Sequence, residues 1–106
     1  MMKQDIAFLL KNGGKVVESV DVLKPDRARV VRVIDVEGWS RSLMEKYQDS
    51  LLDKGWIQKD STKFCKKGVL AKITANAGMR NGRESNLVAM EFDYYSLKEC
   101  AVFPPK

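Results

Sequence analysis

Apolar side chains recur at every second position in the two segments that flank Asn81-Gly82. An Asn-Gly pair favours a type I′ hairpin turn, because both central residues of that turn need a positive φ. With Arg80 opposite Arg83, counting outward predicts four apolar pairs on one face: Ala75 with Val88, Ile73 with Met90, Ala71 with Phe92 and Val69 with Tyr94. The other face receives Thr74 with Ala89, Lys72 with Glu91 and Leu70 with Asp93. A slip of one residue would mix the two sets, so turn and pattern predict the same register.

A stripe of apolar residues at spacings of three and four extends from about Ser40 to Lys54, and this spacing predicts an amphipathic helix. The stripe consists of Leu43, Met44, Tyr47, Leu51 and Leu52, with Trp39 just before it. Ser40 or Ser42 can cap the start of the helix, and Ser42 with Glu45 fits a capping box. Gly55 is suited to end the helix in a left-handed conformation.

Runs of β-branched and apolar residues predict further strands at 27–36, 56–59 and 62–66. Pro25-Asp26 and Lys67-Gly68 supply turns before and after them. The second turn places Phe64 opposite Ala71.

The first 22 residues fit two arrangements. Asn12-Gly13 can join two strands, or Met2, Ile6, Leu9 and Leu10 can form one helical stripe that ends at Gly13. We favour the short helix, followed by a strand over 15–22 that pairs with 27–36. The expected fold is a single α+β domain over residues 1–106: a largely antiparallel sheet with one main helix (about 40–54) packed on one face.

The second face of this sheet is too apolar for a surface that only meets water. It contains Leu70, Leu87, Ala89 and Tyr95, joined by Ile57, Val31 and Val33. We therefore expect the second face to pack against another segment: the N-terminal segment, the C-terminal tail, or a second copy of the chain. Leu70, Leu87 and Tyr95 are the candidate apolar interface.

Composition narrows the possible chemistry. The chain has no histidine, which removes Ser-His and Cys-His nucleophiles and histidine zinc sites. Its two cysteines, Cys65 and Cys100, match no metal or redox spacing, so we expect reduced thiols. The apolar stretch Ile6–Leu10 is too short for a signal peptide or a membrane span, which favours a cytoplasmic protein.

Two groups of basic residues are candidate sites for an acidic group or a phosphate. Arg80 and Arg83 would face each other at the hairpin tip, and Arg27 and Arg29 would follow the strand at 27–36. Each guanidinium offers a planar fork of donors, and the formal net charge is +5. Lys63, Lys66 and Lys67 could extend the second group. The simpler reading of both groups is solvated charge that keeps the protein soluble and protects a sheet edge.

Arg32 interrupts the apolar side of its strand. Either a bulge near Val30-Val31 turns it outward, or a carboxylate such as Asp35 or Glu91 pairs with it.

The first hypothesis for function is a non-enzymatic interaction module that binds a protein or itself through the apolar second face. The alternative is a nucleic-acid-binding protein that uses the arginine groups. A weaker alternative is a small-molecule binder with a helix–sheet pocket lined by Trp39, Tyr47 and Phe92. No cofactor, metal site or membrane contact is expected.

Overall fold

The computed structural model describes residues 1–80 and 82–100, which form six strands and three helices. In chain order these are α1 (Met2–Leu10), β1 (Val16–Lys24), β2 (Arg27–Asp35), α2 (Arg41–Asp53), β3 (Ile57–Gln58), β4 (Lys63–Lys66), β5 (Val69–Arg80), β6 (Arg83–Phe92) and α3 (Tyr94–Glu99). The strands form one antiparallel sheet in the order β1-β2-β6-β5-β4-β3. The predicted α+β class, the main helix and the N-terminal helix–strand arrangement are confirmed.

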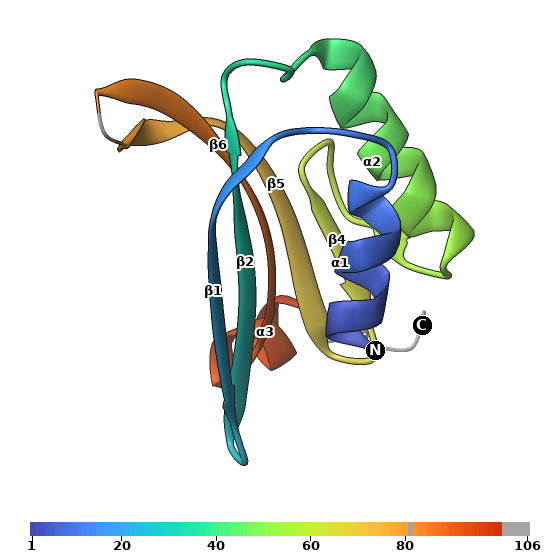
Figure 1. The fold of residues 1–106 in the computed structure, drawn as a ribbon. Coiled ribbons are helices and arrows are strands. Elements are labelled where there is room, and N and C mark those ends of the chain that lie inside the picture. Colours follow the sequence, from blue (N-terminus) through green and yellow to red (C-terminus); the bar gives the residue numbers. More distant parts are fainter. Residues whose placement is uncertain (81, 101–106) are drawn as a thin grey trace.

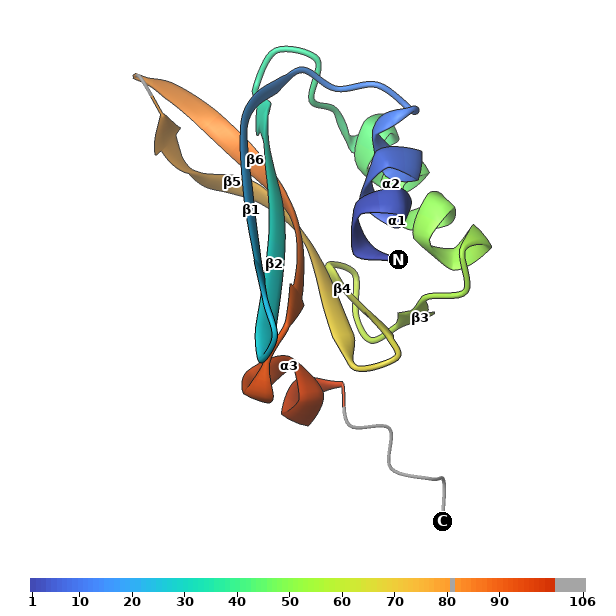
Figure 2. The ribbon, with the colours of Figure 1, turned by 60° about the horizontal axis from the view of Figure 1, so that its bottom comes forward.

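Helices α1 and α2 lie on the same side of the sheet, which we call the inner face (Figure 1, Figure 2). Helix α2 begins at Arg41 because the Ser40 side chain accepts a hydrogen bond from Leu43 N at 3.0 Å. Its apolar stripe packs against alternate residues of the central strands. The resulting core includes Leu43, Tyr47, Leu51, Phe64, Ile73, Val88 and Met90 from α2 and the sheet, with Ile6 and Leu9 from α1. None of the described helices is long and apolar enough to cross a membrane.

The β5–β6 hairpin confirms the predicted bend and corrects the predicted register. Arg80 is opposite Arg83, but the ladder shifts between Gly78 and Thr74, where three residues of β5 face Asn86 alone. Asn76 has a φ of 56° there, and its N–H donates to Asn86 Oδ1 at 3.0 Å. Because of this double bulge, each β5 residue from Thr74 back to Leu70 pairs with a β6 residue two positions earlier than regular counting from the turn predicts.

The seven apolar and polar pairs predicted beyond the bend are therefore wrong. The observed partners are Ile73 with Val88, Ala71 with Met90, Thr74 with Leu87, Lys72 with Ala89 and Leu70 with Glu91. A shift of two residues keeps each side chain on its face, since side chains alternate with a period of two. The predicted faces are thus retained, except that Ala75 lies exposed in the bulge. The predicted pairing of Phe64 with Ala71 across β4 and β5 is confirmed.

The two cysteines form a disulfide bond, so the prediction of free thiols is wrong. Cys65 on β4 and Cys100 after α3 are 35 residues apart in sequence, and their Cα atoms are 5.6 Å apart. Both are buried, and with Leu70 they form a small apolar cluster separate from the main core. Nothing in the cysteine spacing indicates this bond, because it depends on where α3 packs.

Candidate functional site

The end of the sheet at which β6 finishes carries the most exposed aromatic side chains among the described residues. The chain leaves β6 at Asp93, whose carboxylate accepts Ser96 N at 2.7 Å while Asp93 N donates to Ser96 Oγ at 2.8 Å. This reciprocal cap starts α3 at Tyr94. Tyr94 was predicted as a strand partner of Val69, and that prediction is wrong because the cap turns the chain into a helix.

Tyr94 and Tyr95 occupy the first turn of α3 with exposed fractions of 66% and 77%. Their rings pack edge to face with centroids 5.7 Å apart. Helix α3 is too short to be stable alone, but its far side is anchored to the sheet. Ser96 Oγ donates to Gly68 O at 2.9 Å, and the disulfide holds Cys100 against β4. These contacts hold α3 in place on the sheet and so fix the position of the two exposed tyrosines.

Arg27 and Arg29 lie at the same end of the sheet, since Ala28 pairs with Phe92, the last residue of β6. Two shallow hollows share Arg27 and Asp93. The first has a volume of about 230 Å³ and is lined by Asp26, Arg27, Asp93, Tyr94 and Tyr95. The second has a volume of about 310 Å³ and is lined by Val22, Arg27, Ala28, Arg29 and Asp93. We call Arg27, Arg29, Tyr94 and Tyr95 the α3 surface.

The two arginines of the α3 surface differ in their electrostatic environment. Arg29 Nε is 3.3 Å from Glu91 Oε2, and this carboxylate compensates part of its charge. Among the described residues Arg27 makes no ion pair. Arg27 is therefore available to a partner's carboxylate or phosphate.

The hairpin tip lies at the other end of β6, so the structure separates the two arginine groups proposed from the sequence (Figure 1). Arg80 and Arg83 are opposite each other in the backbone register, as predicted. Their side chains lie outside the described residues. The nucleic-acid hypothesis from the sequence used both arginine groups, but one compact ligand cannot contact both of them.

The predicted apolar interface is divided by the structure. Leu70 is buried beneath the disulfide, Leu87 is half-buried on the outer face, and Tyr95 belongs to α3. The outer face also carries an ionic network, in which Glu91 bridges Arg29 and Lys72, the latter at 3.5 Å. Lys72 is directly opposite Ala89, so this network lies over part of the apolar surface. The N-terminal helix covers the inner face instead, and residues 101–106 lie outside the described residues.

The three residues proposed to line a helix–sheet pocket do not meet around a cavity. Tyr47 is fully buried and donates to Gly13 O at 2.6 Å, and burial raises its pKa to about 12. Trp39 packs edge to face on Tyr47 with centroids 6.0 Å apart. Phe92 lies at the far end of the sheet, near Gly68.

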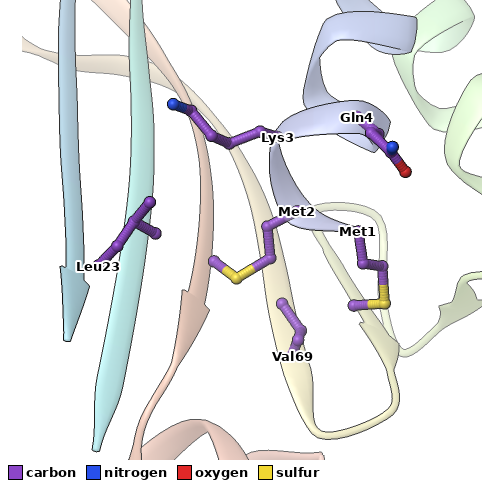
Figure 3. Close-up of a pocket in the computed structure, with 6 residues that line it drawn as sticks. All are labelled: Met1, Met2, Lys3, Gln4, Leu23 and Val69. Atoms are coloured by element: carbon purple, nitrogen blue, oxygen red, sulfur yellow. The ribbon is translucent and has the colours of Figure 1, made fainter. Parts of the chain in front are cut away.

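A different hollow does lie between α1 and the sheet, with a volume of about 460 Å³ (Figure 3). Its lining comes from the first turn of α1 and from two strands: Met1, Met2, Lys3, Gln4, Leu23 and Val69. In Figure 3 Met2 and Leu23 approach the hollow from opposite sides, and the Lys3 amine points away toward the strands. Sequence analysis did not find this hollow, because it depends on where α1 docks.

Arg32 remains on the inner side of its strand, and the proposed bulge at Val30-Val31 is wrong. Its partner is Asp21 on β1, whose Oδ1 is 2.6 Å from Arg32 Nη1, and Lys3 Nζ is 3.3 Å from Asp21 Oδ2. The hydrogen bond from Arg32 is the main cause that lowers the pKa of Asp21 below its usual value. The strand irregularity lies in β1, between Val16 and Glu18.

Buried Asp5 on α1 is a polar centre that sequence analysis also missed. It accepts Trp56 Nε1 at 2.8 Å and pairs with Lys66 Nζ at 3.0 Å. Lys66, which was a candidate for a wider basic surface, thus has a structural role. Over residues 1–80 and 82–100, no group of three or more histidine, cysteine or acidic side chains is arranged to hold a metal ion.

Comparison with protein-family models finds no match, and neither curated protein sequences nor solved structures give one. The functional proposal therefore depends on the residues of this chain alone.

Proposed function

We propose that this protein is a non-enzymatic binding module that contacts a second protein through the α3 surface. The observation that carries the proposal is the exposure of Tyr94 and Tyr95 in a hollow shared with Arg27, which makes no ion pair within residues 1–80 and 82–100. Tyrosine and arginine are enriched at protein interfaces and among the residues that contribute most to binding. A tyrosine ring also offers large contact area with few rotatable bonds.

The chemistry of the α3 surface specifies the kind of partner. Arg27 would bind a carboxylate, while the Tyr94–Tyr95 pair would pack against an apolar side chain nearby. Arg29, which shares Glu91 with Lys72, would contribute less charge than Arg27. The net charge of +5 favours encounter with acidic partners. The expected ligand is therefore an acidic segment with apolar side chains interspersed.

Two chemical features support a non-enzymatic role and bear on the compartment. The chain has no histidine to act as a general base near neutral pH. The buried Cys65–Cys100 bond favours an oxidising compartment over the cytoplasm that the sequence suggested.

A second candidate is the binding of single-stranded nucleic acid. Two exposed aromatic rings beside Arg27 match the combination of stacking and charge that such proteins use. The sequence predicted Tyr94 on the apolar face opposite Val69, and its exposure in the structure strengthens this candidate.

One set of binding measurements separates these candidates. The probes are synthetic peptides that alternate Glu with Phe or Leu, the same peptides with Lys in place of Glu, and oligothymidine. We expect the acidic peptides to bind and the lysine peptides to fail. Tyr94→Ala combined with Tyr95→Ala should weaken binding about tenfold or more, and Arg27→Glu should reverse the charge preference. Leu52→Ala, on the exposed side of α2, is the matched control and should bind as the wild type does.

Oligothymidine binding that falls steeply with salt and is lost in the tyrosine variants would establish the second candidate instead. If neither probe binds, or if the tyrosine variants bind unchanged, the α3 surface is not the site.

A further inference from the structure

The β1 strand forms a long free edge of the sheet. It has nine residues, pairs only with β2 among the described elements, and lies at the border of the sheet in Figures 1 and 2. The opposite border is β3, which has two residues. A free edge presents unpaired N–H and C=O groups along its length, so β1 offers a template for another strand and β3 hardly does.

Exposed apolar side chains are concentrated on this edge strand. Val16, Val17, Val20 and Leu23 are 39%, 49%, 39% and 59% exposed, respectively. Natural edge strands are usually protected by lysine, proline or a bulge in the middle of the strand. Between Val16 and Leu23 there is no lysine, arginine or proline, and the irregularity lies near the start of the strand. The charges within this span are the acidic Glu18 and Asp21, and Asp21 is bound by Arg32 and Lys3, so no basic residue or proline protects the middle of β1.

The sequence of β1 complements itself at one antiparallel register. With Val20 opposite Val20 of a second copy, counting outward places Ser19 opposite Asp21 and Glu18 opposite Val22. The count ends there, because β1 is irregular between Val16 and Glu18. No like charges face each other over this span, and the exposed Val20 side chain meets its own copy across the axis. A shift of the centre to Asp21 would instead place two aspartates opposite each other, which destabilises a strand pair.

We infer that two copies of this chain pair through β1, with the two-fold axis at Val20, to form one continuous antiparallel sheet. The two α3 surfaces then lie toward opposite ends of that sheet, because the paired strands are antiparallel. This inference uses a different surface from the proposed function, so either can fail without the other.

The mass of the full-length protein in solution, measured by light scattering over about a hundredfold range of concentration, tests the dimer. We expect a dimer that dissociates on dilution. Val20→Lys and Val20→Glu should each be monomeric, because each variant places two like charges face to face. Mixing equal amounts of the two variants should restore a dimer, since lysine then faces glutamate. This rescue depends on the register, because only a residue on the two-fold axis meets its own copy.

Leu52→Lys on α2 is the control for added surface charge and should leave the dimer intact. Circular dichroism of both Val20 variants should match the wild type, since the side chain is partly exposed at an edge. A wild-type protein that is monomeric throughout overturns the inference. A dimer that persists in both single variants, or a mixture that stays monomeric, overturns the proposed register.

Discussion

At the residue scale, Tyr47 shows how a single buried hydroxyl joins two parts of the fold. Its hydroxyl donates to Gly13 O, and a Cβ on Gly14 would lie 2.4 Å from the Tyr47 hydroxyl oxygen. Gly14 also has a φ of 101°, which other L-residues rarely adopt. Glycine at position 14 therefore lets the loop before β1 close over α2, and the Tyr47 hydroxyl stabilises the closed loop.

Replacing Tyr47 by phenylalanine should lower the free energy of unfolding by about 1–2 kcal/mol, because Gly13 O loses a buried donor. The effect should depend on pH in the alkaline range. Burial raises the pKa of the folded-state hydroxyl from 10.0 to about 12, so the folded state holds this proton more tightly than the unfolded chain does. The corresponding stabilisation is complete below pH 10 and is lost as the pH rises through about 12.

Denaturant titrations of the wild type and Tyr47→Phe across this range test both effects. The wild type should lose more stability than the variant between pH 10 and 12, so the two curves should converge. Curves that stay parallel would show that Tyr47 ionises equally easily in the folded and unfolded chain.

At the scale of elements, the disulfide and α3 depend on each other. Helix α3 has six residues, and its contacts with the sheet include the Ser96–Gly68 hydrogen bond and the Cys65–Cys100 bond. The double variant Cys65→Ser, Cys100→Ser should lower the free energy of unfolding by about 2–4 kcal/mol, in line with a closed loop of this length. Amide hydrogens of α3 should exchange faster than those of α2 in the same sample.

The reduced wild-type protein should have the same free energy of unfolding as the double variant. This control shows whether the loss comes from the missing disulfide or from the serine side chains. Equal stability of all three samples would show that packing and the Asp93–Ser96 cap suffice to hold α3.

Elements with a local pattern could be predicted from the sequence. The apolar stripe at 40–54 matches α2 at Arg41–Asp53, and the β-branched run at 27–36 matches β2 at Arg27–Asp35. The faces of the hairpin were also predictable, because alternation is a local property. The register of the hairpin could not be predicted, because the bulge at Asn76 is stabilised by Asn86, ten residues away.

The candidate site was predictable only in part. Arg27, Arg29 and Tyr95 were identified from the sequence, but as members of separate surfaces. The Asp93-x-x-Ser96 cap is a local signal for α3, and the alternation of Phe92 and Tyr94 concealed it. The proximity of Arg27 to Tyr94 depends on the pairing of β2 with β6, which no local pattern specifies.

At the scale of the whole molecule, Asp5 connects three segments that are distant in sequence. Its carboxylate on α1 accepts a hydrogen bond from Trp56, which follows α2, and pairs with Lys66 on β4. Lys66 also donates to Lys54 O at 2.6 Å, and its ammonium group lies 5.9 Å from the Trp56 ring centroid. One buried oxygen of Asp5 thus fixes the position of α1 against the rest of the core.

Substitutions at Asp5 should therefore reduce stability in a graded order. Asp5→Asn retains an oxygen that can accept the Trp56 indole but loses the charge that faces Lys66, and we expect a loss of about 1–2 kcal/mol. Asp5→Ala leaves Trp56 Nε1 without an acceptor and leaves Lys66 with Lys54 O but no carboxylate, and we expect a loss of about 3 kcal/mol. Glu45→Gln is the matched control, because its ion pair with Arg41 is exposed and should contribute less than about 0.5 kcal/mol. Unfolding followed by tryptophan fluorescence measures all three, and equal losses for Asn and Ala would show that the charge alone holds α1 in place.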